Sequence, residues 1–86
     1  VAVSEAEKFT LMQRIKEALT FNDAQVSLLD GVRADFDHGW GLIRASNTTP
    51  SLVLRFEADN DTALLQIQQL FRTALHKLLP GVTLPF

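Results

Sequence analysis

The sequence predicts a small α+β domain of two layers, in which two helices cover one face of an antiparallel sheet of about four strands. Apolar residues recur at helical spacing near both ends of the chain and alternate with polar residues between them. With 47% apolar and 21% charged residues in a chain of 86, the composition is that of a globular protein. We therefore expect one domain covering residues 1–86.

A first helix is predicted to start at Ser4, because Ser4 and Glu7 have the spacing of a capping box. The apolar residues that follow form one stripe at helical spacing, and charged residues such as Lys8 fall mostly outside it. Asn22 and Asp23 end the helix. The predicted buried stripe consists of Phe9, Leu11, Met12, Ile15, Ala18 and Leu19.

From Gln25 the spacing of apolar residues changes to two, which is typical of strands with one buried face. Val26 and Leu28 predict a first strand, and the pair Asp30-Gly31 marks a turn after it. Three more strands are predicted around Val32 to Phe36, Trp40 to Arg44 and Leu52 to Glu57, with a turn at Asp37 to Gly39.

A second, longer helix is predicted after a polar cluster in which Asp59 or Asp61 can accept hydrogen bonds from the first backbone N–H groups. Pro80 and Gly81 end this helix. We expect the terminal Phe86 to pack back onto the domain. The predicted buried stripe is Leu64, Ile67, Leu70, Phe71, Ala74, Leu75, Leu78 and Leu79.

The charge and the hydropathy of the chain exclude several classes of partner. Eight basic and ten acidic side chains give a net charge of −2, which is poorly suited to binding nucleic acid through its phosphates. No apolar run approaches the roughly 18 residues of a membrane span. We expect a cytoplasmic protein that binds neither nucleic acid nor a membrane. Val1 to Val3 read as the end of a strand, which suggests a piece of a longer protein.

The residues offer neither a catalytic set nor a metal site. Asp35, Asp37 and His38 are interpreted as solvated strand and turn residues, and not as a metal cluster. The chain has no cysteine, and neither His38 nor His76 is predicted to lie near a candidate serine. We therefore predict no catalytic residue and no metal ligand in this chain.

The segment RASNTTP, residues 44–50, joins two predicted strands and is longer and richer in donors than a hairpin requires. Arg44 offers a planar fork of donors suited to a phosphate dianion, Ser46 and Thr48 offer hydroxyls, and Asn47 offers an amide. The turning backbone can add N–H groups to this set. The residues alone leave two interpretations open, a polar hairpin loop or a phosphate-binding loop that lacks the Walker lysine and glycines.

The stretch DGVRADFDHGWGLIRASNTTPSLVLRFEA closely resembles the C-terminal domain of the α-D-phosphohexomutases, in particular the bacterial phosphomannomutase/phosphoglucomutase branch of alginate and lipopolysaccharide precursor synthesis. RASNTTP is the form that the phosphate-binding loop of the family takes here. The resemblance implies a TATA-binding-protein-like domain that closes over the active-site cleft of a four-domain enzyme. It also implies that the phosphoserine and the Mg²⁺ ligands belong to the other three domains, so this chain alone is expected to bind no cofactor and to be inactive.

Carried over by position, Arg44, Ser46, Asn47 and Thr48 would hold the phosphate of the phosphosugar that is not being transferred. The implied partners are the 1- and 6-phosphates of glucose or mannose, the bisphosphate intermediate, and the other three domains. Asn47 fits the mannose/glucose enzymes better than relatives with glycine there, and Thr49 departs from the glutamate common at its position. Two alternatives are the same domain of a phosphoglucosamine mutase and a free-standing regulatory module that binds an anionic ligand.

Overall fold

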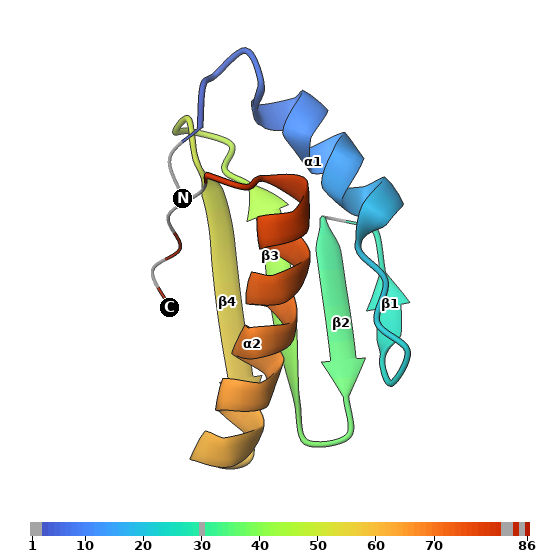
Figure 1. Cartoon of the computed structure of the whole chain (residues 1–86). Coiled ribbons are helices and arrows are strands. Elements are labelled where there is room, and N and C mark those ends of the chain that lie inside the picture. The colour runs from blue at the N-terminus through green and yellow to red at the C-terminus, as the bar shows by residue number, and fades with distance from the viewer. Residues whose placement is uncertain (1–2, 30, 82–83, 85) are drawn as a thin grey trace.

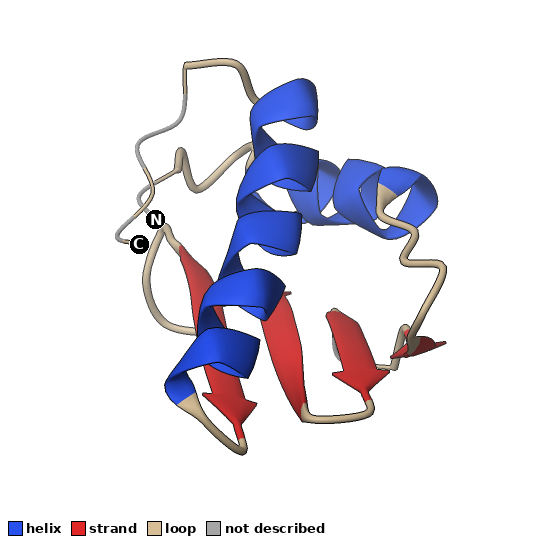
Figure 2. Cartoon of the chain, turned by 60° about the horizontal axis from the view of Figure 1, so that its bottom comes forward, coloured by secondary structure: helices blue, strands red, loops and turns tan. Residues whose placement is uncertain are grey.

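Helices and antiparallel strands form two layers in the computed structural model, which describes residues 3–29, 31–81, 84 and 86. Figure 1 shows the two helices against one face of the sheet, and Figure 2 shows the same layers from a view turned by 60°. In sequence order the elements are α1 (Lys8–Ala18), β1 (Gln25–Ser27), β2 (Val32–Phe36), β3 (Gly39–Ala45), β4 (Leu52–Ala58) and α2 (Asp61–Leu78). The strand order is β1-β2-β3-β4, so the predicted fold class is confirmed.

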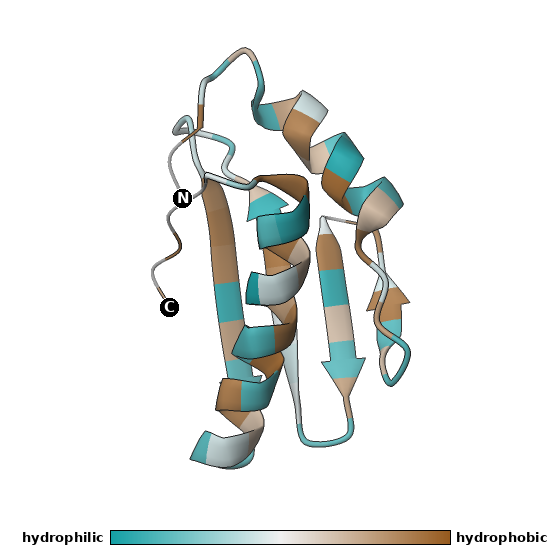
Figure 3. Cartoon of the chain, viewed as in Figure 1, coloured by the Kyte–Doolittle hydropathy of each residue, from teal (hydrophilic) through white to brown (hydrophobic). Residues whose placement is uncertain are grey.

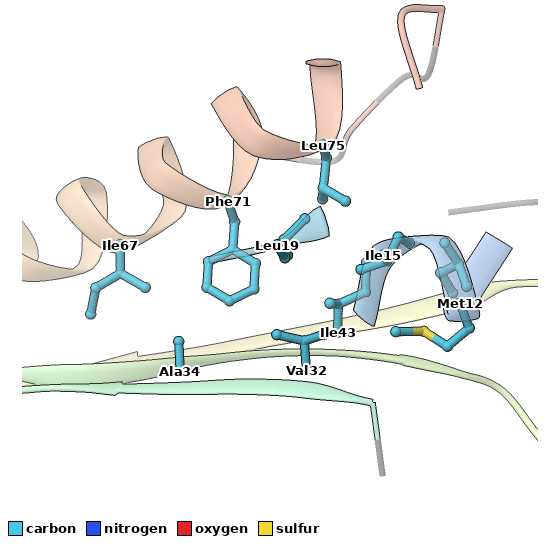
Figure 4. Packing of buried hydrophobic residues seen from close by; sticks show 10 residues of the cluster. Met12, Ile15, Leu19, Val32, Ala34, Ile43, Ile67, Phe71 and Leu75 are labelled. Carbon is cyan, nitrogen blue, oxygen red and sulfur yellow. The ribbon is translucent and has the colours of Figure 1, made fainter. Parts of the chain in front are cut away.

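The core lies between the helices and the covered face of the sheet (Figure 4). Alternating hydrophobic and hydrophilic residues along β2 are visible in Figure 3, and the hydrophobic ones face the helices. The ring of Phe71 in α2 is fully buried and stacks on Phe21 with a centroid distance of 4.9 Å. The buried hydrophobic cluster comprises Met12, Ile15, Leu19, Val32, Ala34, Ile43, Leu52, Ile67, Phe71 and Leu75.

The first helix begins later than predicted, and its buried face differs from the predicted one at a few positions. Ser4 Oγ accepts a hydrogen bond from the Glu7 backbone N–H at 3.1 Å, so half of the capping box forms, but it closes a turn and the helix starts at Lys8. The prediction that Phe9 is buried was wrong, because its side chain is 63% exposed. Met12, Ile15 and Leu19 are buried as predicted, whereas Ala18 was also predicted to be buried and is exposed. Lys8, one turn before Met12, joins the buried face in place of Phe9.

The first strand lies at the edge of the sheet and contributes little to the core. β1 pairs with β2 alone, in a register that places Val26 opposite Ala34. The prediction that Val26 and Leu28 form a buried face was wrong, because both side chains are exposed and Leu28 lies beyond the strand. In Figures 1 and 2, α2 crosses the sheet near β3 and β4 and leaves this edge uncovered.

The cap of the second helix is the asparagine between the two predicted aspartates. Asn60 Oδ1 accepts a hydrogen bond from the Ala63 backbone N–H at 2.8 Å, so Asn60 satisfies one of the free donors at the helix start. Leu70 is exposed, although it was predicted to be buried, because it lies beside the stripe that Ile67 and Phe71 turn toward the sheet. Neither described helix combines the length and the apolar character needed to cross a membrane.

Both ends of the chain contact the domain. The ring of Phe86 meets the ring of Phe56 with a centroid distance of 5.0 Å, so the predicted return of the C-terminus is confirmed. The predicted strand at Val1 to Val3 falls largely outside the described residues. Val3, which is described, is not in a strand, but its backbone N–H donates to the carbonyl oxygen of Pro50 at 2.9 Å.

We predict that Phe71→Ala lowers the free energy of unfolding by about 3–5 kcal/mol, because it removes a buried ring and leaves a cavity that rigid neighbours cannot fill. Urea denaturation followed by circular dichroism measures the change. Leu65→Ala on the same helix is the control: its side chain is 65% exposed, and its effect should stay within about 0.5 kcal/mol. Equal effects of the two substitutions would contradict the assigned core.

Candidate functional site

Two paired strands position the candidate loop. β3 and β4 stay in register as far as the pair Ala45 and Leu52, and residues 46–51 connect them. Ile43 is fully buried and Ala45 packs against the core, so Arg44 between them lies on the open face of the sheet. Arg44 therefore leaves β3 on the uncovered side of the molecule, next to the start of the loop.

The guanidinium of Arg44 is available to a ligand. No hydrogen bond or ion pair joins it to any residue that the structure describes. Arg33, on the same face of the sheet, differs: its Nε and Nη2 donate to the Asp35 carboxylate at 3.1–3.2 Å, and its guanidinium lies 4.4 Å from the centre of the Trp40 ring. The hydrogen bond to Asp35 is the main cause that raises the pKa of Arg33. Arg33 is thus bound within the fold, and Arg44 has no partner in the part of the chain that the structure describes.

A glycine holds the backbone next to Arg44 in place. Gly31 has φ of +130°, a conformation that other residues rarely adopt. A Cβ atom at Gly31 would also lie 2.2 Å from the carbonyl oxygen of Ile43 and 2.8 Å from Cβ of Arg44. The predicted turn is therefore consistent with the structure at Gly31, while its partner Asp30 lies outside the described residues.

Ser46 closes the loop on itself. Its backbone N–H donates to the carbonyl oxygen of Ser51 at 2.9 Å. Its Oγ accepts from the backbone N–H groups of Thr48 and Thr49 at 3.4 and 3.3 Å, and from Thr49 Oγ1 at 2.9 Å. Two backbone N–H groups of the loop, which was predicted to offer such groups to an anion, are thus directed at the Ser46 hydroxyl oxygen.

The other two predicted residues, Asn47 and Thr48, expose their side chains. The side chains of Asn47 and Thr48 are exposed, and neither has a hydrogen-bond partner among residues 3–29, 31–81, 84 and 86. The structure therefore gathers Arg44, Ser46, Asn47 and Thr48 in one short stretch at the end of β3. Three of these side chains have donors without a partner among the described residues, and the fourth, Ser46, organises the loop.

Lys8 is the residue that the sequence analysis missed. Its Nζ donates to the carbonyl oxygen of Thr49 at 3.2 Å and forms an ion pair with Glu5 at 3.1 Å, although its side chain is only 1% exposed. Lys8 precedes Met12 by four residues and Ile15 by seven, which places it on the core face of α1. This spacing was the signal in the sequence. The buried lysine ties the first helix to the candidate loop.

No metal site appears in the described part of the chain. No group of three histidine, aspartate or glutamate side chains there could hold a metal ion. Asp35 is bound by Arg33, and His38 Nδ1 lies 3.5 Å from Asp59 Oδ2 at the exposed turn. The described residues therefore do not fit Mg²⁺, and any Mg²⁺ in a longer protein would need other ligands.

The candidate loop lies apart from a wide concavity of the molecule. This concavity, about 1010 Å³, lies between the end of α1 and α2, with Phe21, Leu65 and Thr73 among its lining residues. None of residues 44–51 lines it. A ligand bound at the loop would therefore lie outside this concavity.

The chain is similar to known proteins along its whole length. The family described as phosphoglucomutase/phosphomannomutase, C-terminal domain, matches residues 1–74. A phosphomannomutase/phosphoglucomutase of Pseudomonas putida is 45% identical over 86 residues, which cover 100% of this chain and 19% of that protein. A phosphoglucosamine mutase of Methanococcus aeolicus is 47% identical over 47 residues, which cover 55% of this chain and 10% of that protein.

A solved structure shows the same arrangement of elements. The crystal structure of a phosphoglucomutase/phosphomannomutase family protein from Burkholderia thailandensis superposes with a TM-score of 0.86 at 45% identity, covering 92% of this chain and 18% of that one. This chain therefore spans about a fifth of the length of the proteins it matches. These likenesses agree with the resemblance that the loop and its flanking strands indicated.

We predict that Lys8→Met loosens the loop without unfolding the domain. Methionine fills much of the same space, and removing a buried charge offsets the lost ion pair, so global stability should change by less than about 1 kcal/mol. The Ser51 amide, which shares the Thr49 carbonyl with Lys8, should exchange with solvent about two- to tenfold faster. Hydrogen exchange followed by NMR measures this. Lys16→Met on the same helix is the control, and equal exchange rates in both variants would contradict the tie.

Proposed function

The chain belongs to the family of C-terminal domains of phosphoglucomutases and phosphomannomutases, and on that premise we propose that its β3–β4 loop binds the phosphate of a phosphosugar that is not being transferred. The observation that carries this proposal is the guanidinium of Arg44 at the end of β3, which has no partner among the described residues and lies next to a loop of hydroxyl and amide donors. Arginine presents two parallel N–H donors that match two phosphate oxygens. Asn47 and Thr48 add donors from the exposed side of the same loop.

A site of this kind suits a reaction in which the sugar must bind in two orientations. In the proposed reaction a hexose 1-phosphate and a hexose 6-phosphate interconvert through a bisphosphate that turns end over end. The phosphate far from the reacting centre is then on carbon 1 in one half of the reaction and on carbon 6 in the other. Donors that contact the phosphate and leave the sugar ring alone accept both.

The wider role is part of the same proposal. We propose that this chain acts as one of four domains, that it closes over the cleft formed with the other three, and that the chain alone has no mutase activity. The phosphoserine and Mg²⁺ would belong to the other domains, and the substrates would be glucose and mannose phosphates. Phosphosugars carry charges that keep them from crossing membranes, so we place the protein in the cytoplasm.

Two other assignments remain distinguishable from this one. The likeness to a phosphoglucosamine mutase covers 55% of the chain, whereas the likeness to a phosphomannomutase/phosphoglucomutase covers all of it. The longer match supports the assignment to a phosphomannomutase/phosphoglucomutase. A free-standing regulatory module would bind an anionic ligand through the same loop, and a serine-centred catalytic motif upstream in the same gene would argue against it.

We predict that Arg44→Ala weakens binding of glucose 6-phosphate by about 1.5–3 kcal/mol, because a charge-assisted bidentate contact is lost. Arg44 has no partner among the described residues, so thermal stability should change by less than about 0.5 kcal/mol. NMR titration gives the affinity, and thermal denaturation gives the stability.

Arg33→Ala is the matched control for this experiment. It removes the same charge from the same face of the sheet, but from a guanidinium that Asp35 already binds. Its effect on affinity should therefore be small and should vanish as salt is added. If Arg44→Ala unfolds the domain while the folded fraction keeps its affinity, Arg44 is a structural residue and the site assignment fails.

We also predict that this chain binds the 1- and 6-phosphates of glucose and mannose almost equally, with Kd on the order of millimolar, or about −4 kcal/mol. Contacts from an exposed loop must offset the lost freedom of the ligand without a closed cleft. Backbone amide shifts in the four titrations should centre on Ala45 to Thr49. Strong preference for one sugar, or shifts centred elsewhere, would show that this chain reads the sugar ring itself.

A further inference from the structure

The hydroxyl oxygen of Ser46 is fully used as an acceptor. Two backbone N–H groups, from Thr48 and Thr49, and the Thr49 hydroxyl all direct hydrogens at it. A serine hydroxyl has two acceptor lone pairs and one hydrogen. Three donors on two lone pairs require two of them to share one, and the two N–H contacts, at 3.4 and 3.3 Å, are the long ones that share. The shorter contact from Thr49, at 2.9 Å, takes the other lone pair, so the hydrogen bond that Ser46 Oγ can still form is one in which it donates.

The direction of the hydrogen bonds can be followed back to the start of β4. Thr49 Oγ1 lies 2.9 Å from Ser46 Oγ and 2.7 Å from Ser51 Oγ, both normal lengths for O–H···O bonds. Thr49 has one hydroxyl hydrogen, and it gives this hydrogen to Ser46. The short contact to Ser51 must then run the other way, with Ser51 as the donor. The order of donation is Ser51 to Thr49 to Ser46.

The backbone holds this chain of hydroxyls in place. The Ser46 N–H donates to the Ser51 carbonyl at 2.9 Å, and the Ser51 N–H donates to the Thr49 carbonyl at 2.8 Å. Lys8 donates to that same Thr49 carbonyl. Hydroxyl groups in series polarise one another, so each donation strengthens the next. The arrangement therefore ends in a Ser46 hydrogen that has no acceptor within the loop.

We propose that Thr49 is a positioning residue for the phosphate site: by donating to Ser46 it fixes the Ser46 hydroxyl as a donor toward the ligand. This inference rests on the proposed phosphate binding, and it adds a selectivity. A phosphate dianion offers oxygens that only accept, which is what a committed donor requires. A ligand group that must donate, such as an ammonium, finds no acceptor at Ser46. The loop thereby favours ligand groups that accept hydrogen bonds over groups that must donate them.

A double-mutant cycle tests this, with inorganic phosphate at pH 7.5 as the probe and NMR titration of the 86-residue chain as the measurement. Thr49→Val keeps the shape and removes the hydroxyl, and it should weaken binding about three- to tenfold. Thr49→Ser keeps the hydroxyl and should restore wild-type affinity. In a Ser46→Ala background, Thr49→Val should have no further effect, because Thr49 acts through Ser46.

Two controls separate positioning from damage to the fold. Thr73→Val makes the same change at an exposed position on α2 and should leave the affinity unchanged. Ser51→Ala removes the first donor of the series, two residues away from Thr49, and should weaken binding less than Thr49→Val does, with no further loss once Ser46 is alanine. This second variant keeps the test intact if Thr49→Val lowers thermal stability.

The phosphate titrations distinguish failure of the positioning role from failure of the proposed function. If wild type binds phosphate, Arg44→Ala abolishes binding and Thr49→Val binds like wild type, the positioning role is wrong and the proposed function stands. If Thr49→Val weakens binding equally with and without the Ser46 hydroxyl, Thr49 contacts the ligand itself and the inference is overturned. If wild type does not bind phosphate at any accessible concentration, both the proposed function and the inference fail.

Discussion

The contact between Phe71 of α2 and Gly41 of β3 sets the distance between the two layers. A Cβ atom at Gly41 would lie 2.5 Å from the Phe71 ring, so any larger residue there would push the helix away from the sheet. This close approach brings the ring against Phe21, with which it stacks, and against Phe56, which it meets edge-on at a centroid distance of 5.2 Å. β3 is thereby held between β2 and β4 in the sheet. The position of Arg44, three residues beyond Gly41, follows from that packing.

The loop after β3 is long because hydrogen bonds between its side chains stabilise the change of chain direction. In a tight turn, glycine residues with positive φ would make that change possible. Among the described residues only Gly31 has positive φ, so the loop turns without the left-handed backbone that a two-residue hairpin needs. The hydroxyls of Ser46, Thr49 and Ser51 hydrogen-bond one another, and Lys8 fixes the Thr49 carbonyl from the first helix. A loop ordered in advance loses less freedom when it binds a ligand. Its polar composition therefore supports both the shape of the loop and the chemistry proposed for it.

The sequence predicted the class of fold and the location of most elements because alternation and helical spacing are local signals. It placed Phe9 and not Lys8 on the buried face of α1, since a lysine was counted as a surface residue although its methylenes can pack in a core while its ammonium is bonded. The helix cap fell on Asn60 and not on a neighbouring aspartate because capping depends on backbone angles that composition does not specify. The sequence of the loop showed which donor groups it carries but not which atoms those groups would bond to. The tie between Lys8 and Thr49 joins residues 41 positions apart, which no local pattern reveals.

The candidate site presents donors on a surface whose protein carries a net charge of −2, so attraction to an anion there must come from close contacts and not from the field of the whole molecule. Three of its side chains have donors with no partner in the described chain, and the acceptor capacity of Ser46 is occupied. Such a surface distinguishes a phosphate from a neutral or donating group but has little with which to distinguish one hexose from another. In the proposed reaction that division is an advantage, because the same phosphate contact serves the sugar in either orientation. Recognition of the ring then falls to surfaces that lie outside this chain.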